Sequence, residues 1–252
     1  MPKFFVRTKQ INEDIITILD EDVNHIKNVL RANVNDIINV CNSENSKNYR
    51  CIIDRLENDK IICKIEDEIL SDVEGRINLT IYQGLPKSDK MELIIQKSTE
   101  LGVSEIIPLK MDRCVVVLDS KSESKKIDRW QKIAEVAAKQ SGRDIIPKIN
   151  NVMNVKQVCN LVKEYDAVLL AYENEKNNSI KNELIKLKEM CKDREKINIA
   201  VIIGPEGGIA EEDALMLKNA GAKVITLGNR ILRTETVSLS VASIIMYELE
   251  GE

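Results

Sequence analysis

Hydrophobic positions change their spacing at about residue 76 and divide the chain into two parts. In the first part, short apolar runs bounded by polar turns predict strands at 4–7, 36–41, 49–53 and 60–65. The last two would pair as a hairpin across Glu57-Asn58-Asp59. One helix is predicted between the strands, with Asp20 as a candidate N-cap and an apolar face formed by Val23, Ile26, Val29 and Leu30. Short strands with a single helix predict a small β-barrel over residues 1–72.

After a polar linker, strand-like and helix-like segments alternate. Strands are predicted at 77–83, 105–109, 166–172, 198–203 and 222–227. Helices are predicted at 88–101 (capped by Ser88), 125–141, 154–164, 181–192, 211–220 and 236–249. This alternation is typical of a largely parallel sheet with helices on both faces. The pattern therefore predicts an α/β domain over residues 73–252.

Two glycine-bearing segments follow predicted strands in the last third of the chain. They read Gly204-Pro205-Glu206-Gly207-Gly208 and Leu227-Gly228-Asn229-Arg230-Ile231-Leu232-Arg233-Thr234-Glu235-Thr236. Ligands of open α/β sheets bind at the carboxyl ends of the strands, so we expect both segments at one site. Neither fits the dinucleotide-binding or the P-loop pattern. An ordinary strand–helix turn is an alternative for the first segment, and a helix-capping motif around Thr234 is an alternative for the second.

Composition narrows the possible chemistry. The chain has 252 residues, a net charge of −4 and a single histidine, His25. A Ser-His-Asp triad or a histidine metal centre is therefore not available in the last two thirds of the chain. The six cysteines include no Cys-x-x-Cys pair, which favours reduced thiols and no metal. No apolar run is long enough for a signal peptide or a membrane span, which favours a cytoplasmic protein that binds no membrane.

Several motifs together resemble the RsmE family of the SPOUT class of RNA methyltransferases. They are Met1-Pro2-Lys3-Phe4-Phe5-Val6, His25 with Val29-Leu30-Arg31, Gln83 to Glu92, Gln96 to Val103, Arg129-Trp130, Glu135 to Arg143, and the two glycine-bearing segments. One departure is Val237, where the family usually has a small residue. The resemblance implies a PUA-like barrel and an α/β domain with a deep trefoil knot. It also implies S-adenosylmethionine as the methyl donor, a homodimer, and methylation of N3 of a uridine in 16S ribosomal RNA of the small subunit.

The resemblance also implies which residues hold the donor. They are Leu170, Ala171, Ile203, Gly204, Pro205, Glu206, Gly207, Gly208, Leu227, Gly228, Ile231, Leu232, Arg233 and Thr236. Uridine N3 must lose its proton before it attacks a methyl group. Arg113, Arg143 and Arg233 are candidates to stabilise the resulting anion, and Glu100 or Glu235 to accept the proton. For Arg113 and Arg143, phosphate anchoring or an ion pair is an equally good interpretation.

RNA contacts are expected from Arg7, His25, Arg31, Lys87, Lys97 and Arg113, although His25 is more often a structural histidine. The dimer is expected to use the apolar face of the last helix, formed by Val237, Val241, Ile244 and Ile245. Two alternatives stay open. One is a SPOUT methyltransferase that acts on another RNA such as transfer RNA, and the other is a non-catalytic RNA-binding assembly factor.

Overall fold

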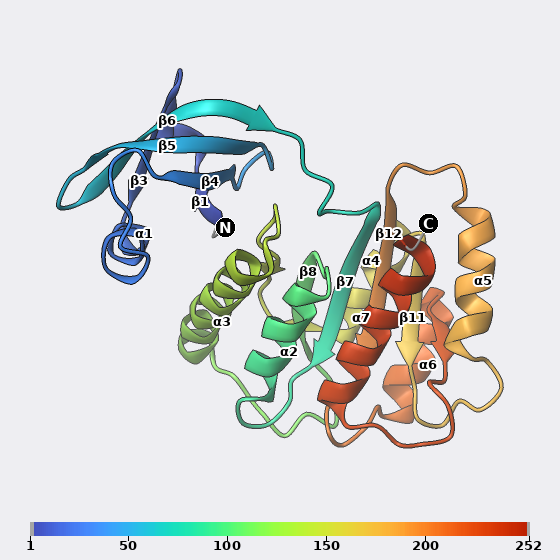
Figure 1. Ribbon diagram of the computed structural model, residues 1–252. Helices are drawn as coiled ribbons and strands as arrows, with labels where there is room; N and C mark the ends of the chain where they lie inside the picture. The colour runs from blue at the N-terminus through green and yellow to red at the C-terminus, as the bar shows by residue number, and fades with distance from the viewer. Residues whose placement is uncertain (1–2, 251–252) are drawn as a thin grey trace. The chain divides into compact units, whose positions relative to one another are not determined.

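The chain forms two compact units, which are described separately. The structure, a computed structural model, describes residues 3–250 (Figure 1). The first unit holds the chain up to Glu74 together with Ala138–Ile146, and the second holds Gly75–Ala137 and the chain from Pro147 onward. Met1 and Pro2, which begin the first family motif, lie outside the described residues.

The first unit is a curled sheet around its own core. Its strands are β1 (Lys3–Val6), β2 (Ile11–Asn12), β3 (Ile15–Leu19), β4 (Ile37–Asn42), β5 (Asn48–Leu56) and β6 (Lys60–Ile69). They pair in the order β1-β4-β5-β6-β3-β2, and every pairing is antiparallel except the one between β1 and β4. Alternate side chains point inward, and Phe4, Ile16, Val40, Ile53 and Cys63 are among the residues that fill the core. The predicted hairpin of β5 and β6 is confirmed.

The helical part of this unit differs from the prediction. It comprises a short α1 (Glu21–Asn24), which continues into one π-helical turn (His25–Val29), and a 3₁₀ turn at Thr8–Gln10. Val23 and Ile26 are buried as expected, but Val29 is 65% exposed and Leu30 is 38% exposed. The wider π turn rotates the later positions away from the core. The Asp20 side chain makes no capping hydrogen bond.

A distant segment completes the first unit. Arg143 is buried and donates from Nε and Nη2 to the Glu74 carboxylate, at 3.1 and 2.8 Å. The same carboxylate accepts the Asp144 N–H at 2.9 Å. Lys3 forms an ion pair with the Asp144 side chain. These contacts explain why 138–146 belongs with a unit whose other residues end at Glu74.

The second unit is built on a sheet in which every pairing is parallel. Its strands are β7 (Ile77–Gly84), β8 (Glu105–Lys110), β9 (Lys148–Ile149), β10 (Met153–Asn154), β11 (Ala167–Ala171), β12 (Ile197–Ile203) and β13 (Lys223–Ile225). The order is β10-β8-β7-β12-β11-β13, with β9 also on β8. The central strands are buried on both faces, so they read as continuous aliphatic runs. The predicted α/β class with a parallel sheet is confirmed.

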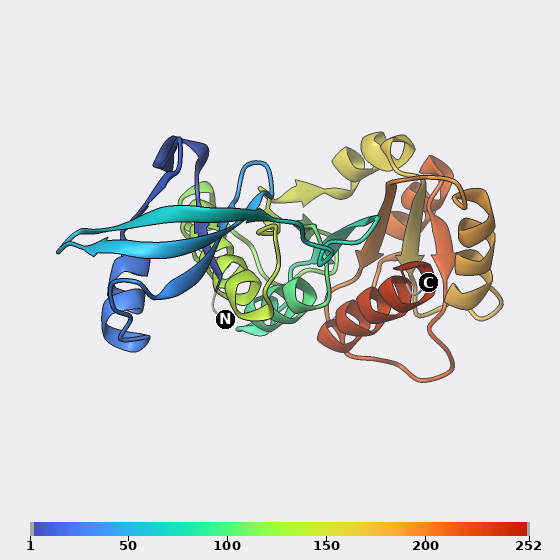
Figure 2. The ribbon, with the colours of Figure 1, turned by 45° about the horizontal axis from the view of Figure 1, so that its top comes forward.

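Helices cover both faces of this sheet. They are α2 (Lys90–Glu100), α3 (Ser120–Ser141), α4 (Val155–Leu161), followed by a 3₁₀ turn at Val162–Glu164, then α5 (Ile180–Met190), α6 (Glu211–Ala220) and α7 (Thr234–Glu250). Both views place α2 and α7 on one face of the sheet and α4 and α6 on the other (Figures 1 and 2). Helix α5 contacts α7 and β13.

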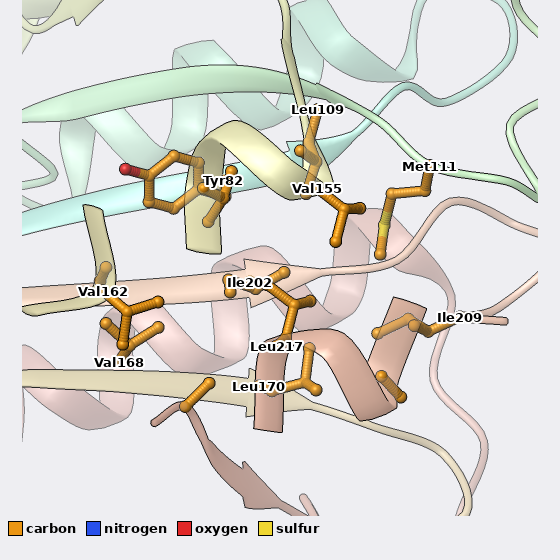
Figure 3. Packing of buried hydrophobic residues seen from close by; sticks show 14 of the residues in the cluster. Tyr82, Leu109, Met111, Val155, Val162, Val168, Leu170, Ile202, Ile209 and Leu217 are labelled. Atoms are coloured by element: carbon orange, nitrogen blue, oxygen red, sulfur yellow. The ribbon is translucent and has the colours of Figure 1, made fainter. Parts of the chain in front are cut away.

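Aliphatic side chains from strands and helices form the core under α4 and α6. Figure 3 shows Leu170 and Ile202 of the sheet facing Val155 of α4 and Leu217 of α6. The Tyr82 hydroxyl lies at the margin of this core, 2.8 Å from the Tyr165 hydroxyl. Burial of this apolar surface fixes the helices on the sheet and so fixes the loops that follow the strands.

Most element boundaries agree with the prediction within a few residues, but three helix starts differ. Helix α3 begins at Ser120, five residues before the predicted start at residue 125. Helix α2 begins at Lys90 after Asp89, and Ser88 has a positive φ of 56° in place of a capping conformation. Helix α7 begins at Thr234, two residues earlier than expected. The trefoil knot that the resemblance implies stays a prediction.

Candidate active site

Four neighbouring strands end at the same level of the sheet. Ile203 at the end of β12 is in register with Gln83 of β7 and with Ala171 of β11, and Ala171 is in register with Ile225 of β13. The loops that follow these strands therefore leave the sheet side by side. This is the edge at which parallel sheets bind ligands.

The first glycine loop, residues 204–208, is packed too tightly for a side chain at Gly204 or at Gly84 of the neighbouring strand β7. A Cβ on Gly204 would lie 2.7 Å from the Ile209 side chain, and a Cβ on Gly84 of β7 would lie 2.6 Å from the Pro205 nitrogen. Gly208 has a φ of 73°, which favours glycine. Two residues separate the loop from α6, whose N-cap is Ala210, and the Gly208 N–H closes the loop by donating to the Pro205 carbonyl at 3.0 Å.

The second glycine loop, residues 227–233, is open in comparison. Gly228 has a φ of 107°, and no atom lies within 4 Å of the position of a Cβ there. Ile231 is 91% exposed. Leu232 is half-buried, and the Arg233 side chain is exposed at the end of the loop. This loop therefore exposes main-chain groups and aliphatic side chains that a ligand could contact.

The two glycine loops and the end of β11 enclose a cavity of about 540 Å³. This volume lies within the range of small-molecule sites, about 300–1,000 Å³. The residues that line it are Lys90, Ala171, Tyr172, Glu173, Ile203, Gly204, Pro205, Glu206, Gly207, Gly208, Ile225, Thr226, Leu227, Gly228, Asn229, Arg230, Ile231, Leu232, Arg233, Thr234 and Val237. The expectation that the two loops form one pocket is confirmed.

Three charged side chains, linked by contacts through Lys90, lie at one side of the cavity. Lys90 of α2 lies 3.0 Å from Glu206 of the first glycine loop and 3.4 Å from Glu235 in the first turn of α7. The Glu206 carboxylate also accepts the Lys87 N–H at 3.0 Å. The Glu235 oxygen nearest to Lys90, Oε2, is buried. The Lys90 ammonium group and the Glu206 carboxylate therefore line the cavity, and the Glu235 carboxylate lies next to Lys90.

These contacts favour the charged forms of the first two groups. Hydrogen bonding to Glu206 is the largest cause that raises the pKa of Lys90. Burial raises the pKa of Glu206, but hydrogen bonds from its own backbone N–H, from Lys90 and from the Lys87 N–H outweigh it, so that pKa lies below its usual value. Both side chains are therefore ionised at neutral pH.

A third carboxylate, that of Glu173, also contacts the first glycine loop. Glu173, just after β11, accepts the Ile209 N–H at 3.1 Å. A Cβ on Gly208 would lie 2.0 Å from its Oε1. Arg113, which follows β8, donates to the Gly207 carbonyl at 3.2 Å. The Glu173 and Arg113 side chains thus bond backbone groups at the end of the first glycine loop.

Most of the residues proposed to hold the donor line this cavity. Two do not: Leu170 is fully buried in the core, and Thr236 is exposed on α7 outside the lining. The sequence interpretation missed Lys90, because only the fold brings the first turn of α2 to this edge. It also missed Ile225 and Thr226, which it counted as strand.

The proposed catalytic residues fall into two groups. Arg233 lines the cavity, and Glu235 lies beside it through Lys90. Glu100 is at the far end of α2, about 15 Å along the helix from Lys90, and forms an ion pair with Lys97 at 2.8 Å. Arg143 belongs to the first unit and bonds Glu74 there. Of the four, only Arg233 lines the cavity, with Glu235 next to it, and the catalytic roles of all four stay predictions.

The proposed RNA-binding residues lie on both units. In the first unit, Arg7 and Arg31 are exposed, and His25 is half-buried with its ring edge-to-face against Phe4 at 5.8 Å. In the second unit, Lys87 and Arg113 are exposed close to the first glycine loop.

Among residues 3–250 no helix is long and apolar enough to cross a membrane, and no group of three His, Cys, Asp or Glu side chains could hold a metal ion.

Comparison with known proteins identifies the family. A family model described as an RNA methyltransferase domain matches residues 73–246, and one described as an RNA methyltransferase PUA domain matches residues 18–66. The ribosomal RNA small subunit methyltransferase E of Bacillus subtilis is 37% identical over 254 residues, which cover 99% of this chain and 98% of that protein. This chain belongs to the RsmE family of RNA methyltransferases.

Other RsmE relatives and solved structures agree over the whole length. The Mesomycoplasma hyopneumoniae protein is 34% identical over 95% of this chain and 96% of its own. The RsmE structure from Neisseria gonorrhoeae, bound to S-adenosyl methionine, is 28% identical and has a TM-score of 0.82, with 98% of this chain and 97% of that chain covered. A Legionella pneumophila methyltransferase with bound S-adenosyl methionine has the same TM-score at 26% identity and covers 97% of this chain and 96% of its own. The first unit thus contains the residues matched by the PUA model, and the second contains most of those matched by the methyltransferase model; they are called the PUA domain and the methyltransferase domain below.

Proposed function

We propose that this enzyme transfers a methyl group from S-adenosylmethionine to N3 of a uridine in 16S ribosomal RNA of the small subunit. The observation that carries the proposal is the cavity between the two glycine loops, at the carboxyl ends of β11, β12 and β13. The relatives named above act on small-subunit ribosomal RNA, and two structural neighbours hold the same methyl donor.

The lining of the cavity fits a cationic nucleoside. Main-chain groups of the second glycine loop are accessible because Gly228 has no side chain, and Leu227 and Leu232 supply apolar surface for a base. Glu173 and Glu206 place carboxylates at the rim, which suits a positively charged ligand. Bound there, the sulfonium supplies an electrophilic methyl carbon for in-line displacement.

Arg233 and Glu235 would serve the acceptor base. Uridine N3 carries a proton, and removing it leaves a negative charge spread over the base oxygens. The exposed guanidinium of Arg233 can donate to these oxygens in a fork geometry. The Glu235 carboxylate, which pairs with Lys90 at 3.4 Å, can take the N3 proton directly or through a water molecule.

RNA would be held by both domains. Arg7 and Arg31 of the PUA domain, with Lys87 and Arg113 near the first glycine loop, provide exposed cations for phosphates. The net charge of −4 argues against affinity for any RNA regardless of its shape. The substrate is therefore expected to be the assembled small subunit, whose folded RNA offers a defined shape. Ribosomal subunits are cytoplasmic, and so is the proposed site of action.

A homodimer is the proposed state of the enzyme. Of the expected contact residues on α7, Val241 and Ile245 are buried in their own subunit, while Val237 and Ile244 are half-buried. The outer face of α7 also carries Tyr247, which is 78% exposed. This face provides the apolar surface for a second copy, and sedimentation of the purified protein at two concentrations would test it.

Methylation of ribosomal particles tests the function. Small subunits from a strain lacking the enzyme would be incubated with the protein and labelled S-adenosylmethionine, and the modified nucleotide mapped by mass spectrometry. We expect one N3-methyluridine in 16S RNA of intact particles and much less in naked RNA. Methylation of transfer RNA instead would favour the second candidate substrate. Tight donor binding in calorimetry distinguishes an enzyme from a non-catalytic assembly factor.

A further inference from the structure

A buried network of uncharged side chains lies beneath the cavity. Gln83 and Ser238 are fully buried, and Thr234 is 5% exposed. They come from the end of β7 and from the first two turns of α7. Gln83 and Ser238 do not line the cavity, and the chemistry proposed above does not use them.

The hydrogen bonds of this network connect both walls of the cavity. Gln83 Nε2 donates to the Gly84 carbonyl and to Thr234 Oγ1, each at 2.9 Å. Thr234 Oγ1 in turn donates to the Gly204 carbonyl at 2.7 Å. The Ser238 hydroxyl lies 2.5 Å from Gln83 Oε1. A continuous path therefore runs from β7 to the start of the first glycine loop and to the end of the second.

The donors and acceptors of the network are matched to one another. The single Thr234 proton goes to Gly204, so the lone pairs of its oxygen are available to Gln83, and the amide of Gln83 donates on one side and accepts on the other. Removing a member leaves a buried carbonyl or amide unsatisfied, which is unfavourable because the group has lost its water and gains no partner. The strands are fixed by the core, so the loops can relieve this cost most easily by moving apart to admit water.

We infer that Gln83 is a positioning residue, which holds the two glycine loops at the separation that the methyl donor requires. The inference rests on the proposed function, because it names the donor as the ligand. Gln83 acts through Thr234 and Gly204 and does not touch the ligand itself. Loss of the network is expected to weaken donor binding more than it weakens the fold.

The test uses the full-length protein and three changes in the network. Gln83→Met keeps the length of the side chain but removes its hydrogen bonds, Thr234→Val keeps the shape but removes the hydroxyl, and Ser238→Ala removes the third contact. Thr80→Val is the matched control: Thr80 is a buried threonine on the same strand, and its hydroxyl bonds Glu105 at 3.2 Å, away from the cavity. Calorimetry gives the dissociation constant for S-adenosylmethionine, and thermal unfolding without ligand gives the stability.

We expect Gln83→Met and Thr234→Val to weaken donor binding at least tenfold, and Ser238→Ala to weaken it less. Thr234→Ser, which restores the hydroxyl, should recover most of the affinity lost in Thr234→Val. Steady-state kinetics should show a raised KM for the donor, with kcat at saturating donor within about threefold of wild type. Thr80→Val should lower the unfolding temperature by a similar amount without changing the affinity.

Two results would overturn the inference. One is wild-type affinity in both Gln83→Met and Thr234→Val. The other is a loss of affinity in Thr80→Val as large as theirs at equal stability, which would show a general structural effect. If one variant fails to fold, the other and Ser238→Ala carry the same comparison. Wild-type protein that binds no S-adenosylmethionine would overturn the proposed function itself, a result distinct from normal wild-type binding with unaffected variants.

Discussion

Gly228 has a backbone conformation that residues with a Cβ rarely adopt. Its φ is 107°, and a side chain there would cost about 1–3 kcal/mol in strain even though the surrounding space is open. Gly228→Val is therefore expected to change the path of the second glycine loop and to block donor binding. Isothermal calorimetry with S-adenosylmethionine measures this directly.

Gly221 offers a control for this change. It has a φ of 116° at the C-terminal end of α6 and does not line the cavity. Gly221→Val should lower stability by a similar amount and leave the donor affinity within about threefold of wild type. Unchanged affinity in Gly228→Val would remove the second glycine loop from the donor site.

Arg233 is placed to act on the acceptor. Among residues 3–250 the structure gives its guanidinium no ion pair, and the side chain is exposed at the rim of the cavity. Removing one donor that stabilises a transition-state charge lowers turnover by about 100- to 1,000-fold. Arg233→Ala should lose at least that much methylation activity, with an unchanged unfolding temperature. Arg129→Ala, which removes an exposed ion pair with Glu92, should stay near wild type; near-normal turnover in Arg233→Ala would refute the role.

The sequence predicts which side chains lie close together only where they are near one another in the chain. Arg233 and Glu235 are two positions apart at one loop end, so their proximity follows from the motif. Glu100 pairs with Lys97 within one helix turn, but the ion pair between Arg143 and Glu74 joins positions 69 residues apart. Nothing in the local pattern of 135–143 indicates that carboxylate. Lys90 was missed for the same reason.

At the scale of elements, Lys90 and Glu206 connect α2 to the first glycine loop. The pKa of Glu206 lies below the 4.5 of the unfolded chain, so the pair stabilises the fold above pH 4.5, and this contribution is lost as the pH falls below that value. Both side chains are partly exposed, so we expect Glu206→Gln to lower the free energy of unfolding by no more than about 1 kcal/mol at pH 7.

Urea unfolding at pH 7 and at pH 4 would measure this. Wild type should lose more stability than Glu206→Gln over that interval, because the variant has no carboxylate to protonate. Equal losses in both proteins would mean that the contact does not favour the ionised carboxylate.

Two buried thiols make β5 and β6 sensitive to alkaline pH. Burial is the largest cause that raises the pKa of Cys51 and of Cys63 from 9.0 to about 12. The unfolded chain therefore loses these protons at lower pH than the folded chain, and the stability of the PUA domain should fall between pH 9 and pH 12. Stability measured at pH 8 and pH 10.5 should differ less in Cys51→Ala/Cys63→Ala than in wild type. An identical pH dependence would contradict this account.

Periodicity was sufficient for most elements of the methyltransferase domain, because long amphipathic helices and fully buried strands give strong signals. It failed in the PUA domain, where elements are short. The run at Ile15–Leu19 forms β3, which the sequence pattern does not predict, since four apolar residues around a single threonine favour neither period. The helix after Asp20 became a π turn because the sheet, and not the helical repeat, decides which side chains are buried.

At the scale of the whole molecule, the ion pair of Arg143 and Glu74 joins the segment 138–146 to the rest of the first unit, and removing it tests whether this contact stabilises the fold. Arg143→Leu leaves a largely buried carboxylate without its guanidinium, which costs about 3–5 kcal/mol. We expect a loss of that size in urea unfolding. A catalytic role alone predicts lost methylation with normal stability, so the two measurements together separate the interpretations.

The PUA domain takes one of its segments from the middle of the sequence, 138–146. A ribosome that synthesises this protein must therefore complete more than half of the chain before the carboxylate of Glu74 and the ammonium of Lys3 can meet their partners at Arg143 and Asp144. Until then, the N-terminal strands have left the ribosome but lack the contacts of residues 138–146. Ribosome-bound chains should accordingly gain protease resistance in this region only after residue 146 has emerged.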